Sequence, residues 1–214
     1  MTPRRSGRQK KFKHTPHKNN KLPLAIGLLI IIIVLITVVY VFAMNNSSDS
    51  NTTEDKGITT TEEKVLLRTS MGNITIQLRD DRPITTSNFK NLVQEGVYDG
   101  TIFHRVIADF MIQGGDPTGT GYGDPSIPSI QDELDGVNEN NRGTIAMANT
   151  GSPNTGSSQF FINVVDNNYL DTQHSVFGTV ISGMDVVDDI SEVATNANNR
   201  PTIEVKLIKA EIIS

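Results

Sequence analysis

From residue 64 onward, apolar and polar residues alternate in short runs. Residues 65–69 and 73–78 flank a Ser-Met-Gly turn, and the second run alternates at every position. Because a period of two places every second side chain on one face, these runs predict a β-hairpin. Similar patterns predict strands at residues 100–107, 110–113, 143–148, 159–165, 176–181 and 203–212, and a short helix at 184–190.

A second helix is predicted by residues that recur at helical spacing. Phe89, Leu92 and Val93 share one helical face, a Thr or Ser at 85–87 is expected to cap the first turn, and Gly96 to end the helix. Eight strands and two helices without a repeated strand-helix-strand unit favour a mainly β fold. We predict a closed eight-stranded antiparallel β-barrel capped by two helices.

The 23 residues 22–44 precede this region and carry no charge. At ~1.5 Å per helical residue they reach roughly 35 Å, enough to cross a ~30 Å hydrocarbon layer. A buried soluble helix would show a polar face, and the apolar core of a cleaved signal peptide is usually shorter. We therefore predict an uncleaved transmembrane helix, a signal anchor, while cleavage after Ala43 stays open as an alternative.

Charge is distributed unequally on the two sides of this apolar run. Residues 1–21 hold eight basic side chains and no acid, whereas the residues after Met44 hold 11 basic and 24 acidic side chains, a net charge of −13. Basic segments beside a span remain in the cytoplasm. We expect a single-pass protein of the cell membrane with a cytoplasmic basic arm and an extracytoplasmic C-terminal domain. Nucleic-acid binding by the arm is the less favoured interpretation.

Residues 45–63 are polar and of low complexity, which predicts a flexible linker to a domain at 64–214. The chain has no cysteine, so this domain must be stabilised by a hydrophobic core. No cofactor or metal is expected, because the oxygen spacing in 132–139 does not fit a calcium loop. The glycine-rich residues 119–123 lack the spacing of a dinucleotide loop and predict the rim of a groove.

Residues 103–116 are the most informative stretch, because they place one cation and one amide among apolar and aromatic side chains. They offer no nucleophile motif and no proton-transfer pair. This combination favours a site that binds a peptide and changes its shape without covalent chemistry.

Four blocks, in order, carry a resemblance to a known family: residues 103–116, 143–149, 157–162 and 170–178. They resemble the signature blocks of the cyclophilin family of peptidyl-prolyl cis/trans isomerases, and the similarity covers about residues 65–212. The resemblance implies an eight-stranded β-barrel with a substrate groove on one outer face. It also implies proline-containing polypeptides as substrates.

Position by position, the resemblance implies catalytic roles for Arg105, Gln113 and Phe110. It implies substrate binding by Met111, Ala148, Asn149, Gln159, Phe161, Tyr169, Leu170 and His174, of which Ala148 and Asn149 match the segment that binds the residue before proline. Tyr169 departs from the tryptophan of well-known eukaryotic members. This departure implies weak cyclosporin binding and, with the missing cysteine and the asparagine-rich linker, favours a bacterial host.

The chemistry of these residues supports the resemblance. A peptide bond resists rotation because its nitrogen shares a lone pair with the carbonyl, giving a barrier of ~18–20 kcal/mol. Rotation localises that lone pair, and the guanidinium of Arg105 could then donate to it more strongly than to the planar amide. His174 is assigned to binding only, since no proton is transferred; His104 and Phe160 are expected to be structural. The alternatives are a membrane-tethered peptide-binding chaperone module with little catalysis, and a structural anchor protein.

Overall fold

The computed structural model describes residues 63–213. The predicted basic arm, the predicted membrane span at 22–44 and nearly all of the predicted linker lie outside the described residues. Among residues 63–213, no helix combines the length and the apolar character that crossing a bilayer requires.

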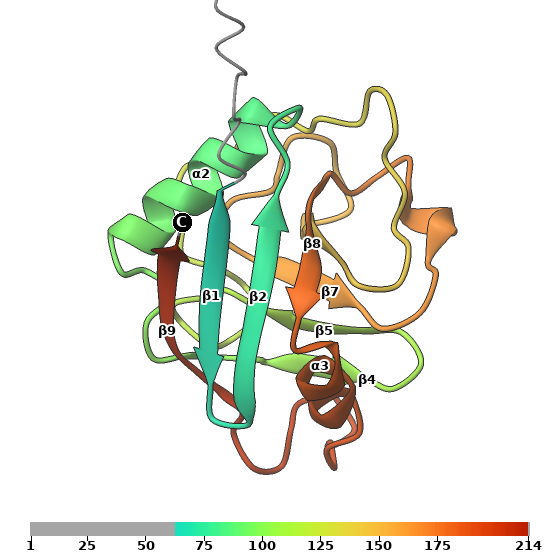
Figure 1. Ribbon diagram of the computed structural model, residues 1–214. Helices are drawn as coiled ribbons and strands as arrows, with labels where there is room; N and C mark the ends of the chain where they lie inside the picture. Colours follow the sequence, from blue (N-terminus) through green and yellow to red (C-terminus); the bar gives the residue numbers. More distant parts are fainter. Residues whose placement is uncertain (1–62, 214) are drawn as a thin grey trace, which may run out of the picture. The chain divides into compact units, whose positions relative to one another are not determined.

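A single antiparallel sheet of nine strands curls around the core, and α2 and α3 lie near opposite ends of it (Figure 1). Its strand order is β3-β9-β1-β2-β8-β6-β7-β5-β4. The strands are β1 (Lys64–Thr69), β2 (Gly72–Leu78), β3 (Thr101–Ile102), β4 (Arg105–Ile107), β5 (Met111–Gly114), β6 (Thr144–Met147), β7 (Phe160–Asn163), β8 (Val176–Ser182) and β9 (Lys206–Ile213). The helices are α2 (Pro83–Gln94), α3 (Met184–Ser191) and the 3₁₀ turn η1 (Asn168–Leu170). The mainly β fold with two α-helices is confirmed.

The predicted closed ring of eight strands needs a correction, because the strand expected at 100–107 is two strands. β3 pairs with β9 and β4 pairs with β5, and these two strands form the ends of the strand order without pairing with each other. Between them, the backbone N–H of the buried Phe103 donates to the carbonyl of Val205 at 3.0 Å. At Phe103 the chain thus passes from pairing with β9 to pairing with β5. The sheet is curled, and β3 and β4 are its two edge strands.

The main core fills the inside of the curled sheet. β1 and β2 alternate as predicted, so that every second side chain enters the core. From α2, the predicted face of Phe89, Leu92 and Val93 packs into the same core. Phe89 and Phe160 lie with ring centroids 5.6 Å apart in an edge-to-face arrangement, so an aromatic cluster joins the helix to β7.

The predicted cap of α2 was wrong, because the helix begins at Pro83, before residues 85–87. The Glu133 carboxylate accepts hydrogen bonds from the backbone N–H groups of Ile84 and Thr85, at 3.1 and 2.8 Å. A carboxylate at a helix N-terminus satisfies free donors and interacts favourably with the helix dipole. The cap therefore comes from a residue about 50 positions away, which local spacing does not reveal.

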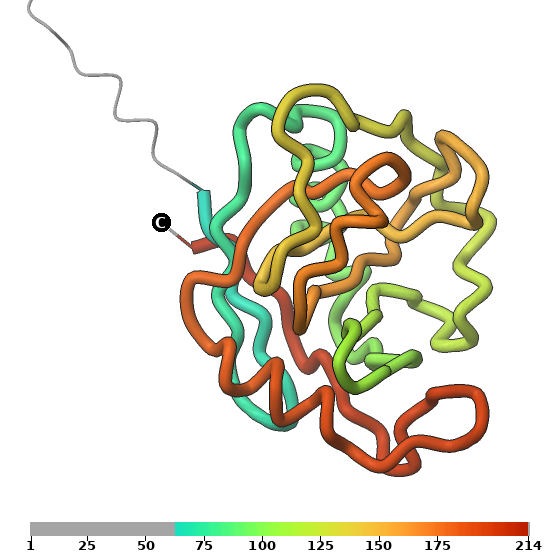
Figure 2. The backbone as a smooth tube through the Cα atoms, turned by 90° about the vertical axis from the view of Figure 1, so that its right-hand side faces the viewer, coloured from blue at the N-terminus to red at the C-terminus, as the bar shows by residue number. Residues whose placement is uncertain are grey.

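β6 and β7 are buried on both faces, since every residue of the two strands is buried. Ala146 and Phe161 of these strands belong to a second, smaller apolar cluster made of Met111, Ala146, Ala148, Phe161 and Val176, with Ile107, Phe110 and Leu170 packed against it. The first part of the connection from β5 to β6, yellow-green in Figure 2, lies on the side of the domain opposite β1 and β2. An apolar surface is thus built on the outside of the sheet, between loops.

Candidate active site

Arg105 lies half-buried on β4, directly across the ladder from Gln113 on β5. Its Nη1 donates to Oε1 of Gln113 at 3.2 Å and lies 4.0 Å from the sulfur of Met111. The guanidinium carbon sits 5.7 Å from the centre of the Phe110 ring, a distance typical of a cation–π contact. The β4–β5 hairpin alone therefore brings together four of the predicted site residues.

Arg105 has no carboxylate partner among residues 63–213, where every ion pair involves other residues. Burial lowers the pKa of its guanidinium from the ordinary value, although an arginine remains charged at neutral pH. A desolvated cation without a counter-charge keeps its hydrogen-bond donors available for an acceptor that enters the site.

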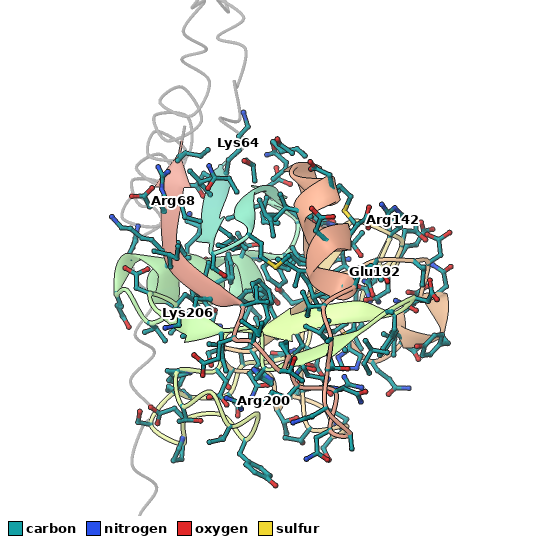
Figure 3. The ribbon with its side chains drawn as sticks, turned by 90° about the horizontal axis from the view of Figure 1, so that it is seen from below. Lys64, Arg68, Arg142, Glu192, Arg200 and Lys206 are labelled. Carbon is teal, nitrogen blue, oxygen red and sulfur yellow. The ribbon has the colours of Figure 1, made fainter. Side chains whose placement is uncertain are left out.

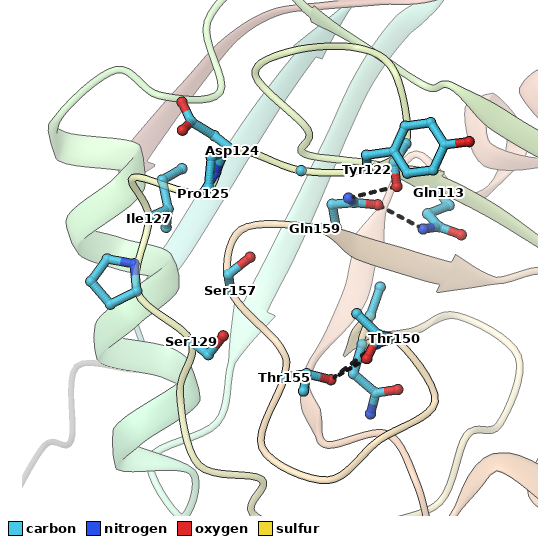
Figure 4. A pocket seen from close by; sticks show the side chains of 15 residues that line it. Gln113, Tyr122, Asp124, Pro125, Ile127, Ser129, Thr150, Thr155, Ser157 and Gln159 are labelled. Carbon is cyan, nitrogen blue, oxygen red and sulfur yellow. Dashed lines mark hydrogen bonds between the residues drawn. The ribbon is translucent and has the colours of Figure 1, made fainter.

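Gln113 is held by a short chain of amides (Figure 4). Its Nε2 donates to Oε1 of Gln159 at 2.9 Å, and Nε2 of Gln159 donates to the carbonyl of Gly121 at 3.1 Å. These bonds fix the Gln113 amide so that its oxygen faces Arg105. The second groove amide predicted from sequence, Gln159, thus supports the first.

The apolar wall of the site is formed around Phe161, which lies opposite Gln113 in the β5–β7 ladder. The ring of His174 meets Phe161 edge-to-face at 5.2 Å, and Leu170 packs against the same cluster. At the outer end, the exposed ring of Tyr169 stacks on Phe110 with centroids 6.2 Å apart.

His174 and Asn149 are placed by backbone carbonyls. Nδ1 of His174 lies 3.0 Å from the carbonyl of Met147, and Nδ2 of Asn149 donates to the carbonyl of Gln173 at 2.7 Å. Ala148 directly follows β6, between Met147 and Asn149. All eleven predicted site residues thus belong to one connected group of contacts, and among residues 63–213 the side chain of His174 has no hydrogen-bonded side-chain partner that would make it a proton-transfer group.

A pocket of about 490 Å³ adjoins this surface (Figure 4). Gln113, Gln159, Ala148 and Asn149 line it together with residues 121–125. Tyr122 is 96% exposed at its edge. Gly121, Tyr122 and Gly123 of the glycine-rich segment thus line this pocket, while their predicted place at the rim of a substrate groove stays a prediction.

This rim is organised by Asp116, to which sequence reasoning assigned no role. Its buried carboxylate accepts hydrogen bonds from the backbone N–H groups of Thr118 (2.9 Å), Gly121 (2.6 Å) and Gly123 (3.2 Å). Nη1 of Arg200, labelled in Figure 3, donates to the carbonyl of Gly119 in the same loop. An aspartate followed by glycines and threonines is typical of such a side-chain-to-backbone turn, and this signal could have identified it.

The Asp116 carboxylate predicts a pH-dependent stability. Burial alone would raise its pKa, but the hydrogen bonds from Thr118, Gly121 and Gly123 hold that pKa below the ordinary value. A lowered carboxyl pKa stabilises the fold above the unfolded value of ~3.9, and this stabilisation is lost as the pH falls through the folded pKa. Asp116→Asn should therefore lower the free energy of unfolding at pH 7 by about 1–3 kcal/mol.

Urea denaturation of both proteins at a series of pH values checks this expectation. The difference between wild type and Asp116→Asn should shrink below about pH 4, where the unfolded aspartate is protonated. A constant difference from pH 7 to pH 3 would contradict the assigned role of the Asp116 charge.

His104 and Phe160 are buried, in agreement with their predicted structural roles. The His104 ring packs under the rim loop, where a Cβ on Gly121 would lie 3.3 Å from it. Burial lowers the pKa of the His104 imidazole. Phe160 points into the main core, on the face opposite Phe161.

Comparison with known proteins shows what this chain is similar to. Residues 64–212 match the family model described as cyclophilin type peptidyl-prolyl cis-trans isomerase/CLD. The peptidyl-prolyl cis-trans isomerase-like 1 of Rhizopus delemar is 49% identical over 152 residues, covering 69% of this chain and 92% of the relative. The human protein of the same name is 47% identical over 150 residues, covering 68% and 90%.

Among solved structures, a cyclophilin type peptidyl-prolyl cis-trans isomerase of Cryptosporidium parvum is 32% identical, with a TM-score of 0.68. It covers 71% of this chain and 98% of its own. The same protein was crystallised in the presence of the dipeptide Ala-Pro, and that structure gives a TM-score of 0.67.

Proposed function

Because this chain belongs to the cyclophilin-type peptidyl-prolyl cis-trans isomerases, an enzyme family, we propose that its Arg105 catalyses rotation about the Xaa-Pro bonds of polypeptide substrates. The reaction makes and breaks no covalent bond. Unaided, an Xaa-Pro bond isomerises in tens to hundreds of seconds. The substrates we propose are proline-containing segments of other polypeptides.

The observation that carries this mechanism is the half-buried guanidinium of Arg105, which has no carboxylate partner among residues 63–213. In the planar amide the nitrogen lone pair is delocalised, and in the twisted amide it becomes a good acceptor. A donor that is already in place therefore interacts more strongly with the transition state than with the ground state, which is the requirement for acceleration. Its hydrogen bond to Gln113 and its contact with Phe110 hold Arg105 in position.

The apolar wall supplies the second part of the proposed mechanism. Met111 and Phe161 are buried side by side in the outer cluster, and Leu170 packs at its edge. An apolar surface of this kind can hold the pyrrolidine ring while the preceding carbonyl turns. It also keeps water away from Arg105, so that a hydrogen bond from the cation is stronger than in solution.

A protease-coupled assay on a short Ala-Pro peptide tests this function with the full chain. We expect a saturable acceleration of the cis-to-trans step. The variant Gln113→Leu keeps Arg105 but removes the amide that orients it, so kcat/KM should fall about tenfold. Asn73→Leu, which makes the same kind of change at an exposed amide on β2 outside this surface, is the control and should retain the wild-type value.

The chaperone alternative makes the opposite prediction in this assay. A module that only binds peptides would bind the Ala-Pro peptide without accelerating its isomerisation. No acceleration by the wild-type chain would therefore sink the catalytic role of Arg105.

We further propose that the domain acts outside a cell membrane, anchored by residues 22–44 with the basic arm in the cytoplasm. The support is the uncharged run of 23 residues and the charge difference across it. The proposed bacterial host and weak cyclosporin binding rest on sequence features alone, including Tyr169. Membrane fractionation, N-terminal sequencing and protease protection in the host test the location; a soluble chain that begins after Ala43 would contradict the anchor.

A further inference from the structure

Tyr169, Leu170 and His174 form one wall of the groove, and none of these residues lies in a strand. Residues 167–174 follow β7 and contain only the three-residue turn η1. A segment without a sheet ladder needs other bonds to fix its position. Besides backbone hydrogen bonds, such bonds come in this chain from four buried asparagines, Asn138, Asn140, Asn163 and Asn167, which we call the asparagine network.

One end of the network reaches the backbone of Phe110. Nδ2 of Asn167 donates to the Phe110 carbonyl at 2.9 Å and to Oδ1 of Asn163 at 2.8 Å. Nδ2 of Asn163 in turn donates to Oγ1 of Thr144 at 2.9 Å and to Oδ1 of Asn140 at 3.2 Å. The side-chain amides of Asn167, Asn163 and Asn140 therefore form a continuous chain. Asn138 joins it through the carbonyl of His174, to which Nδ2 of Asn140 also donates at 3.5 Å.

The other end reaches the backbone of His174. The backbone N–H of Asn140 donates to Oδ1 of Asp171 at 2.7 Å, and Nδ2 of Asn138 donates to the His174 carbonyl at 3.0 Å. Oδ1 of Asn138 accepts the backbone N–H of Val176 at 2.8 Å. These bonds fix the end of the wall segment to the strand that follows it.

The network is deeply buried and its side-chain atoms are paired. The exposed fractions of Asn138, Asn140, Asn163 and Asn167 are 6%, 0%, 0% and 3%. Within residues 63–213, none of their side-chain atoms is among the buried polar atoms without a partner. Burying four amides costs free energy relative to apolar side chains unless their bonds are made, and completed buried networks specify one arrangement.

We propose that the asparagine network positions the two sides of the proline pocket, at Phe110 and at His174. The four amides are then positioning residues for the function proposed above, on which this inference rests. Phe110 and His174, whose carbonyls the network holds, both border the cluster around Phe161. Shortening or breaking the chain of amides would change the distance between them. Catalysis by positioning is sensitive to such changes, because a displacement of ~1 Å can cost ~10²-fold in rate.

The variants Asn167→Leu and Asn138→Leu, and the two combined, test this proposal in the full chain. Each opens one end of the network. At a temperature where circular dichroism shows a folded protein, each is expected to lower kcat/KM for an Ala-Pro peptide about tenfold. Because the network acts as one unit, the loss in the double variant should be smaller than the product of the single losses.

Thr86→Val is the matched control. It removes one buried hydrogen bond, from Oγ1 of Thr86 to the carbonyl of Arg79, on α2 and outside the groove. Its melting temperature should fall while kcat/KM stays at the wild-type value. If the asparagine variants also lose only stability and keep the wild-type kcat/KM, the network is structural and the proposal is overturned.

A wild-type chain without isomerase activity would instead overturn the proposed function. If a leucine variant does not fold, Asn167→Ser and Asn138→Ser replace it, since serine keeps a polar side chain at each position. For the serine variants a loss of kcat/KM supports the proposal, and wild-type kcat/KM with a lowered melting temperature overturns it.

Discussion

Replacing Arg105 by alanine is expected to lower kcat/KM for an Xaa-Pro peptide by about 10²- to 10³-fold, the usual effect of removing one preorganised transition-state donor. The guanidinium lies between Gln113 and Phe110 and has no carboxylate partner among the described residues. Its loss removes the donor but leaves the apolar wall in place. The protease-coupled assay measures kcat/KM, and circular dichroism checks that the variant is folded.

Two further variants sharpen this expectation. Arg105→Lys keeps the charge but lacks the planar fork that can bond Gln113 and the substrate together, so most of the loss should remain. Arg68→Ala removes an exposed arginine that pairs with Glu211, and it should retain full activity. Wild-type kcat/KM in Arg105→Ala would contradict the proposed mechanism.

Phe160→Ala is expected to lower the free energy of unfolding by about 3–5 kcal/mol, the usual cost of deleting a buried phenylalanine. Phe160 is 0% exposed and lies edge-to-face with Phe89 and Tyr98, both at 5.6 Å. Alanine would leave a cavity at the centre of the aromatic cluster that joins α2 to β7. Urea denaturation followed by circular dichroism measures the change.

The exposed Ile203 provides the control, because Ile203→Ala should change the free energy of unfolding by less than about 0.5 kcal/mol. The neighbouring variant Phe161→Ala should lose activity as well as stability, since that ring faces the groove cluster. A Phe160→Ala protein as stable as the Ile203→Ala control would contradict the assignment of Phe160 to the core.

The opposite roles of Phe160 and Phe161 could be predicted from sequence, because neighbouring side chains of a strand point to opposite faces. The hairpin of β1 and β2 and the buried face of α2 were also predictable from local periodicity. Nothing local indicated that Phe103 bonds to Val205, which divides one predicted strand into β3 and β4. The cap of α2 by Glu133 is equally non-local.

The residues of the candidate site were predicted mainly from the family resemblance. The structure adds the contacts that hold these residues in place. Arg105 and Gln113 are eight residues apart, which fits opposite positions of one hairpin. By contrast, Asn138 and Asn167 are separated by about 30 residues and have no period or motif. Their polarity suggests surface loops, whereas the fold buries them. Sequence patterns therefore miss tertiary contacts such as these, which bury polar residues that would otherwise be expected at the surface.

Exchange NMR of an Ala-Pro peptide with the full chain tests the role of Arg105 most directly, because it separates binding from rotation. We predict that Arg105→Ala binds the peptide with a Kd close to that of wild type, while the exchange rate on the enzyme falls by about 10²- to 10³-fold. An unchanged exchange rate, or a loss of activity explained entirely by weaker binding, would contradict transition-state stabilisation by Arg105.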